Sequence, residues 1–159
     1  MVDDATRSVM NGYLEALLAH EDFAAFFAPE VTWTYMESGA EIRGREAVRD
    51  LITGMHQGSF DAHPELRKLV IGDGAALAEA VFIGTHTGEF AGIPATGRQV
   101  RLAYCMVYDV TDGAITALRA YFPEGALAAQ LTGAAAAAAA VPAQERRSPR
   151  PAETGAQRR

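Results

Sequence analysis

The chain has 159 residues, of which 49% are hydrophobic and 21% are charged, and its formal net charge is −6. This length and composition are typical of one soluble globular domain. Residues 1–133 carry nine Lys and Arg against eighteen Asp and Glu, whereas residues 134–159 carry five Arg against two Glu. Nucleic-acid affinity comes mainly from clustered Lys and Arg that neutralise phosphates, so the acidic body argues against a nucleic-acid partner.

Several features of the chain exclude further classes of protein. The single cysteine, Cys105, rules out an internal disulfide and a thiolate metal site. The N-terminus lacks the apolar core of a secretory signal, and the longest apolar run, residues 133–141, is far short of the ~20 residues that cross a bilayer. The four histidines show no metal-ligand spacing. We therefore expect a cytoplasmic protein that uses no membrane and no metal.

The first sixty residues predict two helical regions separated by a short pair of strands. Apolar residues recur at three- and four-residue steps over 4–27, which predicts a long helix and a short second one that ends before Pro29. The run 31–37 is rich in β-branched and aromatic residues and predicts a strand, with 40–44 as its short return. Residues 45–60 are again periodic as a helix.

Four strand-like runs follow, over residues 65–71, 76–90, 99–110 and 115–122, before a short terminal helix at 125–131. The run 99–110 alternates most plainly between the two faces of a strand. Helices first and an antiparallel meander afterwards indicate an α+β fold, in which the N-terminal helices pack over one face of a curved, mostly antiparallel sheet. A sheet curved in this way forms a cone, and the open end of the cone can hold a small molecule.

The composition changes after residue 133. Seven alanines follow, and the rest of the chain has no aromatic residue and no large apolar residue after Val141. A segment of this kind buries too little apolar surface to offset its ordering entropy. We therefore expect a folded domain over 1–133 and a disordered tail, rich in Ala and then in Arg and Pro, over 134–159.

The segment 84–98, with the sequence GTHTGEFAGIPATGR, closely resembles the connection between the two central strands of SnoaL-like polyketide cyclases. Shorter stretches at 26–31, 44–48, 112–115 and 127–131 are similar to the same family. The resemblance covers roughly residues 5–133. It implies the cone-shaped nuclear transport factor 2-like fold, in agreement with the element order, and a homodimer formed through the open face of the sheet.

The resemblance also implies a function. It implies a cyclase or isomerase that needs no cofactor and acts by general acid–base catalysis on a hydrophobic, oxygenated polyketide-type intermediate. One alternative is an epoxide-opening hydrolase or cyclase, as in limonene epoxide hydrolases, although their acid–arginine–acid set is not visible at matching positions. Another is a non-catalytic domain that binds a small molecule. The sequence departs from the cyclases at Pro123, at or next to which they would carry an acidic residue.

A comparison with ketosteroid isomerases, which share this fold, matches only part of their site. Tyr13 falls where those enzymes carry a hydrogen-bonding tyrosine on the first helix. Their base falls at Tyr35, and their protonated acid falls near Cys105 or Met106. Neither acid is present, so the sequence argues against the usual proton shuttle of those enzymes.

The expected chemistry in such a cone is acid–base catalysis by ionisable groups inside an apolar pocket. Alternation along the first strand places Tyr35 and Glu37 on one face, and a neutral histidine such as His86 can act as a base near pH 7. A buried phenol can donate a hydrogen bond to a developing oxyanion. The candidate catalytic residues are Tyr35, Glu37, His86 and Tyr104. The candidate substrate-binding residues are Tyr13, Trp33, Met106, Phe122 and Glu124.

Two further expectations concern charged residues outside this set. His56 and His63 flank the connection between the helix over 45–60 and the next strand, and both are expected at the surface or at the mouth of the pocket. Arg101 and Arg119 share a parity that places them on the outer side of the sheet. There they are expected to pair with Glu79 or Glu89, or to lie in a dimer interface.

Overall fold

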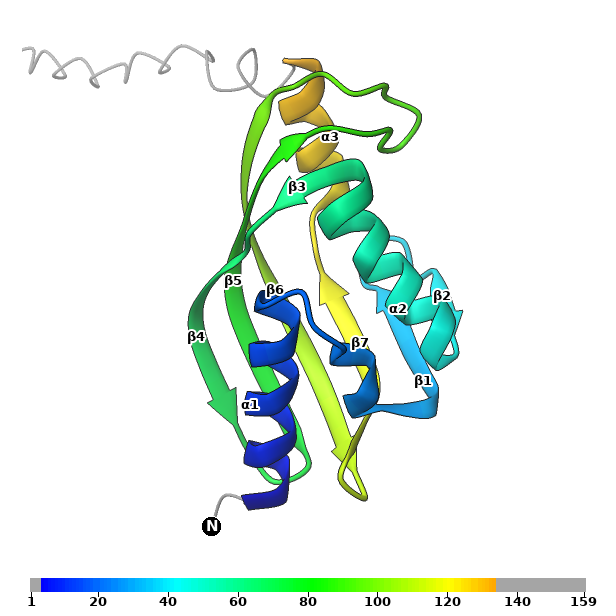
Figure 1. Cartoon of the computed structure of the whole chain (residues 1–159), viewed down its shortest axis with the longest axis vertical. Helices are drawn as coiled ribbons and strands as arrows, with labels where there is room; N and C mark the ends of the chain where they lie inside the picture. Colours follow the sequence, from blue (N-terminus) through cyan, green and yellow to red (C-terminus); the bar gives the residue numbers. More distant parts are fainter. Residues whose placement is uncertain (1–3, 134–159) are drawn as a thin grey trace, which may run out of the picture.

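A computed structural model describes residues 4–133, so the predicted tail at 134–159 lies outside the described residues. The elements, in chain order, are α1 (Asp4–Leu18), η1 (Phe23–Phe26), β1 (Phe27–Tyr35), β2 (Glu41–Arg43), α2 (Arg45–Thr53), η2 (Gly54–Ser59), β3 (Phe60–Ala62), β4 (Glu65–Ile71), β5 (Ala75–His86), β6 (Gln99–Thr111), β7 (Ala114–Tyr121) and α3 (Glu124–Thr132). Figure 1 shows that α1 and α2 both lie against one face of a long, curved sheet. The predicted α+β class, with helices first and strands afterwards, is confirmed.

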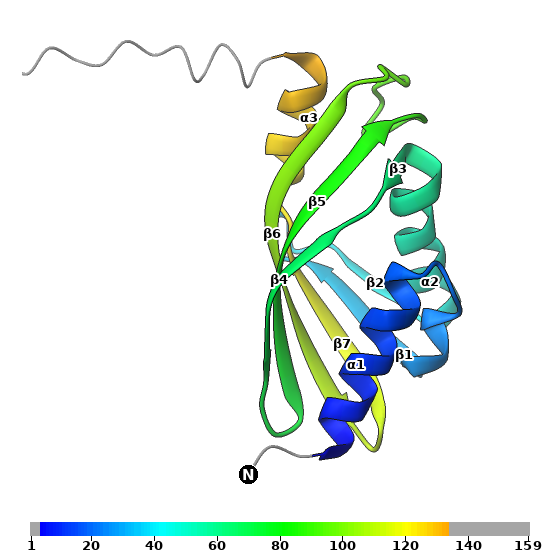
Figure 2. The same cartoon turned by 60° about the vertical axis from the view of Figure 1, so that its left-hand side comes forward.

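The sheet has seven strands in the order β2-β1-β7-β6-β5-β3, and β4 also pairs with β5. All pairs are antiparallel except β1 with β7, which are parallel. Figure 2 shows the strong bend of the sheet, with α1 and α2 on its concave side. The predicted cone with a mostly antiparallel sheet is therefore confirmed.

Alternation along β6 decides which side chains enter the core. The even-numbered residues from Val100 to Val110 are buried or nearly so, and their odd-numbered neighbours are more exposed. The same parity holds on β5, whose inward row runs from Ala76 to His86. The sequence pattern of 99–110 thus predicted the inner face of the central strand correctly.

Three local features differ from the sequence-based expectation. β1 begins at Phe27, four residues earlier than expected, because Pro29 favours extended backbone in the residue before it. The predicted helix over 45–60 changes at Gly54 into the wider π-helical η2, where two glycines lower the helix propensity. β3 was not predicted, because three residues are too few to show a period.

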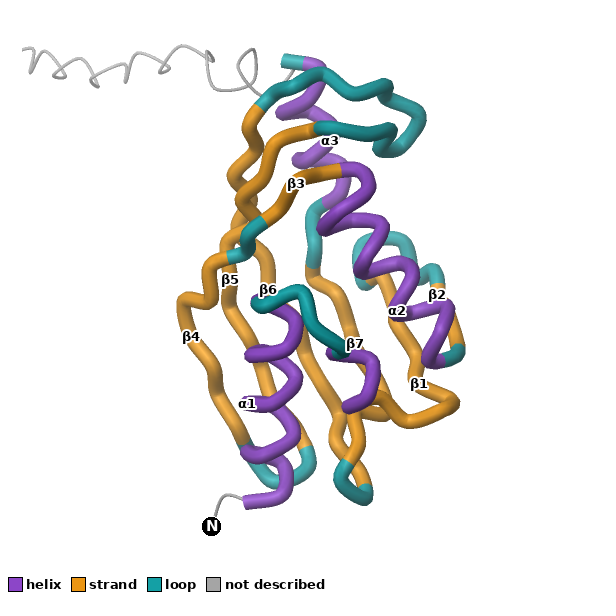
Figure 3. The backbone as a smooth tube through the Cα atoms, in the orientation of Figure 1, coloured by secondary structure: helices purple, strands orange, loops and turns teal. Residues whose placement is uncertain are grey.

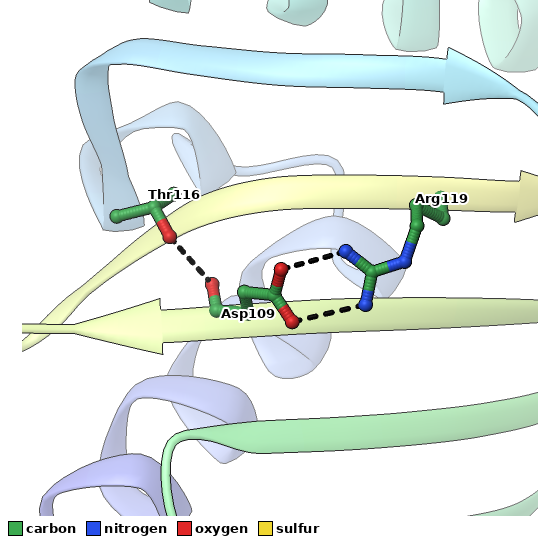
Figure 4. Close-up of polar contacts among 3 residues, drawn as sticks. All are labelled: Asp109, Thr116 and Arg119. Atoms are coloured by element: carbon green, nitrogen blue, oxygen red, sulfur yellow. Dashed lines mark hydrogen bonds and ion pairs between the residues drawn. The ribbon is translucent and has the colours of Figure 1, made fainter.

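The outer face of the sheet carries an ion pair between β6 and β7 (Figure 4). The guanidinium of Arg119 donates to both carboxylate oxygens of Asp109, at 2.6 and 2.9 Å. This contact holds the pKa of Asp109 below its ordinary value. The pairing of Arg119 with Glu79 or Glu89 that we expected is therefore wrong: the partner is the nearest acid diagonally across the strand pair.

The terminal helix is attached to β6 through one side chain. The amide of Gln130 accepts a hydrogen bond from the Arg101 backbone N–H at 3.0 Å and donates one to the Arg101 carbonyl at 2.8 Å. Leu127 and Leu131 are the buried residues of α3. These contacts fix the helix whose first residue, Glu124, reaches the pocket described below.

Candidate active site

An apolar pocket, called here the inner pocket, lies on the concave side of the sheet. Its cavity volume is about 60 Å³, the space of about two water molecules. Its lining comes from α1, β1, α2, η2, β5, β6, the segment before α3 and the first residue of α3. The lining residues are Tyr13, Leu17, Trp33, Tyr35, Leu51, Ile52, Met55, His56, Phe82, Tyr104, Met106, Tyr108, Phe122 and Glu124.

Seven of the nine residues named from the sequence line the inner pocket. All five candidate substrate-binding residues do so, together with Tyr35 and Tyr104 from the candidate catalytic set. The two others, Glu37 and His86, are not among its lining residues. The geometry therefore separates the four candidate catalytic residues into two that share the pocket and two that do not.

Glu37 lies beyond the end of β1, where the alternation of the strand no longer applies. The strand stops at Tyr35, whose carbonyl accepts the N–H of Gly39 at 2.7 Å in a tight turn. The Glu37 carboxylate accepts the backbone N–H of Glu124 at 3.0 Å, so it occupies the start of α3. Glu37 also borders a groove on the outer side with Met36. Glu37 therefore lies outside the strand whose alternation predicted its position relative to Tyr35.

His86 is fully buried at the end of β5 and is bound to the loop that follows it. Its Nδ1 accepts the backbone N–H of Thr96 at 3.1 Å and lies 2.9 Å from the Thr96 hydroxyl. Since Nδ1 accepts a hydrogen bond, the ring proton of the neutral imidazole resides on Nε2. Nε2 is buried and has no hydrogen-bond partner among the described residues. The ring packs against Phe60 at 5.1 Å.

The histidine that lines the inner pocket is His56, which the sequence placed at the surface or at the mouth. It lies on η2, and π-helical turns are often found at functional sites. Burial, and secondarily the charge of His20, lowers the pKa of His56 to about 4, so its imidazole is neutral at pH 7. The signal that could have found it is its spacing, because His56 follows the buried Ile52 by four residues.

Four tyrosines, Tyr13, Tyr35, Tyr104 and Tyr108, are among the lining residues of the inner pocket. Burial raises the pKa of Tyr104 to about 12, and burial together with the charge of Glu124 raises the pKa of Tyr35 to about 12. Burial also raises the pKa of Tyr13 and of Tyr108, whose hydroxyls hydrogen bond to each other. These phenols therefore remain protonated at neutral pH, and those of Tyr35 and Tyr104 can donate hydrogen bonds to a ligand.

Trp33 adds a donor that is not used within the protein. Its Nε1–H is buried without a hydrogen-bond partner among residues 4–133. The indole ring lines the inner pocket and meets the Tyr35 ring edge-on at a centroid distance of 5.7 Å. A buried polar group without a partner is costly, and a ligand oxygen would relieve that cost.

Glu124 is the carboxylic acid among the lining residues. Partial burial, and then the nearby charge of Glu37, raises its pKa above the ordinary value. It directly follows Pro123, the position at which the sequence departs from the related cyclases. Glu124 therefore places a carboxyl group at the start of α3, beside the phenol of Tyr35.

The acid–arginine–acid set of epoxide hydrolases does not occur in the inner pocket. No arginine is among its lining residues, which include one carboxylic acid. The bidentate pair of Asp109 and Arg119 lies on the other face of the sheet, since both side chains have the outward parity of their strands.

The lowered pKa of His56 predicts a pH dependence of stability. As the pH falls, the imidazole of the unfolded chain takes up a proton near pH 6.5, whereas that of the folded chain does so only near pH 4. The free energy of unfolding should therefore be unaffected by the titration of His56 above about pH 6.5. On acidification from pH 6.5 to about pH 4 it should fall by an amount on the order of 3 kcal/mol.

Urea denaturation at pH 7 and at pH 4.5 measures this loss. Carboxylates titrate in the same range, so the comparison is made with His56→Gln, which lacks the titrating group. We expect the free energy of unfolding to fall less steeply with acidification in the variant than in the wild type. Equal slopes would show that His56 titrates alike in the folded and unfolded chains.

Within the part of the chain that the structure describes, the helices are each too short or too polar to cross a membrane. No group of three or more His, Cys, Asp or Glu side chains within residues 4–133 is arranged to hold a metal ion.

The chain is similar to known proteins over nearly all of the described residues. The sequence model of the SnoaL-like polyketide cyclases matches residues 8–131. No curated protein matches the sequence. A candidate SnoaL-like polyketide cyclase from Jannaschia sp. CCS1 has a similar structure, with a TM-score of 0.73, 13% identity, and coverage of 82% of this chain and 94% of that one.

Two further structures show the same fold. A candidate polyketide cyclase from Xanthomonas campestris pv. campestris has a TM-score of 0.67 and 24% identity, with 80% and 97% of the two chains covered. TsrD from Streptomyces laurentii has a TM-score of 0.67 and 22% identity, with 82% and 97% covered. At such identities the likeness concerns the fold, whereas the family match rests on the sequence itself. Because that match spans most of the chain, the protein belongs to the SnoaL-like polyketide cyclase family.

Proposed function

We propose that the protein is a cyclase or isomerase that needs no cofactor and acts on a hydrophobic, oxygenated, polyketide-type intermediate by general acid–base catalysis. The observation that carries the proposal is a neutral histidine, His56, in the same apolar pocket as several phenols that remain protonated. A neutral base beside hydrogen-bond donors is the set that removes a proton from a carbon next to a carbonyl group.

In this mechanism the imidazole of His56 takes the proton from the α-carbon of a bound ketone, and the electron pair moves to the carbonyl oxygen. Tyr104, Tyr35 or the unused Nε1–H of Trp33 donates a hydrogen bond to that developing oxyanion. The enolate carbon then attacks a second carbonyl carbon, or takes a proton at another position. The imidazolium of His56 then gives its proton to the product, so the base is restored and the charges balance.

A base of this strength is adequate for such chemistry. The pKa of about 4 for His56 is close to that of the carboxylate base that ketosteroid isomerases use for enolisation. The cavity of about 60 Å³ is smaller than a polycyclic substrate, so side chains must move when one binds. Met55 and Met106 are unbranched and are the most adaptable residues of the lining.

Deuterium exchange tests the proposal without knowledge of the natural substrate. The probe is α-tetralone, a bicyclic aryl ketone, incubated in deuterium oxide with the protein and followed by mass spectrometry. Trp33 is the single tryptophan of the chain, so its fluorescence reports whether the probe occupies the inner pocket. We expect exchange at the α-carbon to be faster with the protein than with buffer. Saturated binding without faster exchange would support the non-catalytic alternative.

Incubation of the protein with an epoxide in water labelled with oxygen-18 distinguishes the epoxide-opening alternative. Hydrolysis would place the label in the product, whereas ring closure by an internal hydroxyl would not. The inner pocket favours neither of these reactions, because a single carboxylic acid and no arginine are among its lining residues.

We also propose that two copies pair through the outer face of the sheet. Val70 and Leu77 are direct neighbours across β4 and β5 and are 52% and 37% exposed, and Tyr121 on β7 is 49% exposed. Such exposed apolar groups on an open sheet favour association. Light scattering should give about twice the chain mass of 16.9 kDa, and Leu77→Glu should give the monomer mass. A wild-type monomer at micromolar concentration would contradict the proposal.

A further inference from the structure

The long loop between β5 and β6, residues 87–98, makes close contact with the end of η2. The backbone N–H groups of Thr87 and Gly88 both donate to the carbonyl of Ser59 at 3.0 Å. The Ser59 hydroxyl donates to the carbonyl of Glu89 at 2.7 Å. Ser59 is the last residue of η2, so three hydrogen bonds join this loop to one end of the helix that carries His56. Figure 3 shows the loop reaching toward that end of the helix.

The contact is so close that only glycine fits at position 88. A Cβ atom on Gly88 would lie 2.3 Å from the carbonyl oxygen of Gly58, which is backbone and cannot rotate away. On the other side of the same contact, a Cβ on Gly58 would meet no described atom within 4 Å. The close approach of the two backbones therefore requires glycine at position 88 but not at position 58.

The loop is itself held rigid by His86. The N–H of His86 donates to the carbonyl of Arg98 at 2.9 Å, and the N–H of Gly97 donates to the carbonyl of His86 at 2.9 Å. The His86 Nδ1 binds the N–H of Thr96 at 3.1 Å, so the imidazole joins the end of the loop to its beginning. Backbone groups from three positions late in the loop thus converge on one buried residue.

An aromatic cluster anchors the middle of the loop to the core. Phe90 exchanges two hydrogen bonds with Ile93, at 3.0 and 2.8 Å, and packs its ring against Phe60 at 5.4 Å. Phe60, which is fully buried, also packs against His86 and directly follows Ser59. The loop, its histidine and the end of η2 therefore form one packed unit.

We propose that the loop of residues 87–98 sets the position of η2, so that Gly88 and His86 are positioning residues for His56 in the inner pocket. The inference rests on the proposed role of His56 as the base. η2 is a single π-helical turn, a rare conformation that needs support from its surroundings, and His56 is three residues from Ser59. The positioning role would account for the glycine- and proline-containing segment 84–98, which has no direct part in the proposed chemistry.

Gly88→Ala tests the proposal, with Gly58→Ala as the matched control. The readout is the pKa of His56, followed by NMR titration of its ring protons. In Gly88→Ala the displaced η2 should expose His56, and its pKa should rise by about one unit or more toward 6.5. In Gly58→Ala the pKa should stay at the wild-type value. A role confined to stability would lower the melting temperature in Gly88→Ala and leave the pKa of His56 unchanged, which would overturn the proposal.

Ser59→Ala is the milder variant that keeps the test decisive if Gly88→Ala does not fold. It removes the hydroxyl that binds the Glu89 carbonyl and leaves the two backbone hydrogen bonds in place. The pKa of His56 should move in the same direction by a smaller amount, and no movement would count against the proposal.

The deuterium exchange rate with α-tetralone is measured on the same variants. We expect about a tenfold decrease in Gly88→Ala, because small misplacements of a catalytic group cost large factors in rate. The pKa readout needs no catalysis. If the pKa of His56 shifts in Gly88→Ala while replacement of His56 leaves the exchange rate unchanged, the positioning role is supported and the proposed function is contradicted.

Discussion

Replacing His56 by glutamine should slow deuterium exchange into bound α-tetralone by about 10²–10⁴-fold, the usual contribution of a positioned general base. Glutamine has nearly the same size and can still hydrogen bond, but it cannot take up a proton. The wild-type rate should also fall as the pH drops below about 4, because the protonated imidazole is no longer a base. Mass spectrometry of the ketone at several pH values measures both effects.

Two other histidines serve as comparisons for this result. His63→Gln alters an exposed residue that is not part of the inner pocket, so its rate should equal that of the wild type. His86→Gln tests the candidate base that the sequence indicated, and its effect should be smaller than that of His56→Gln. A larger loss with His86→Gln than with His56→Gln would return the role of base to His86.

Replacing Phe82 by alanine should lower the free energy of unfolding by about 3–5 kcal/mol, the cost of removing a large ring from a well-packed site. Phe82 is 1% exposed, and its ring packs against Phe60, Phe122 and His56 at centroid distances of 5.3, 5.5 and 5.9 Å. Leu18→Ala is the control, since Leu18 is 44% exposed at the end of α1 and should cost less than about 0.5 kcal/mol. Urea denaturation at pH 7 measures both variants.

The same substitution should enlarge the inner pocket, because Phe82 is one of its walls. An apolar cavity of that kind accepts a small aromatic molecule. Benzene should therefore alter the fluorescence of Trp33 in Phe82→Ala more than in the wild type. A cost below about 1 kcal/mol with no such binding would mean that the neighbouring rings close over the space.

Much of the fold could be predicted from local periodicity. Alternation over 99–110 fixed the inward face of β6, and this face contributes Tyr104 and Met106 to the pocket. Trp33 and Tyr35 likewise share a face because they are two residues apart within β1. A period of two or 3.6 identifies the apolar face of an element, and these residues lie within regular stretches of their elements.

The acid–base part of the site could not be predicted in the same way. His56 lies where α2 gives way to a π-helical turn, and Glu37 lies where β1 gives way to a tight turn. His86 follows the strand pattern and points inward, but its ring is bound to the loop of residues 87–98 and does not line the inner pocket. Each side chain is placed by contacts with distant parts of the chain, which local spacing does not encode.

The parallel pairing of β1 with β7 has a consequence for the order of folding. Trp33 lies opposite Leu118, and Tyr35 lies opposite Ala120, so this edge of the sheet joins segments more than eighty residues apart. During synthesis the first strand has no neighbour on that side until nearly the whole domain has left the ribosome. Closing so long a stretch of chain is slow, because its entropic cost precedes the gain from pairing. We therefore expect the pairing of β1 with β7, which completes the wall of the pocket that carries Trp33, to be a late step of folding.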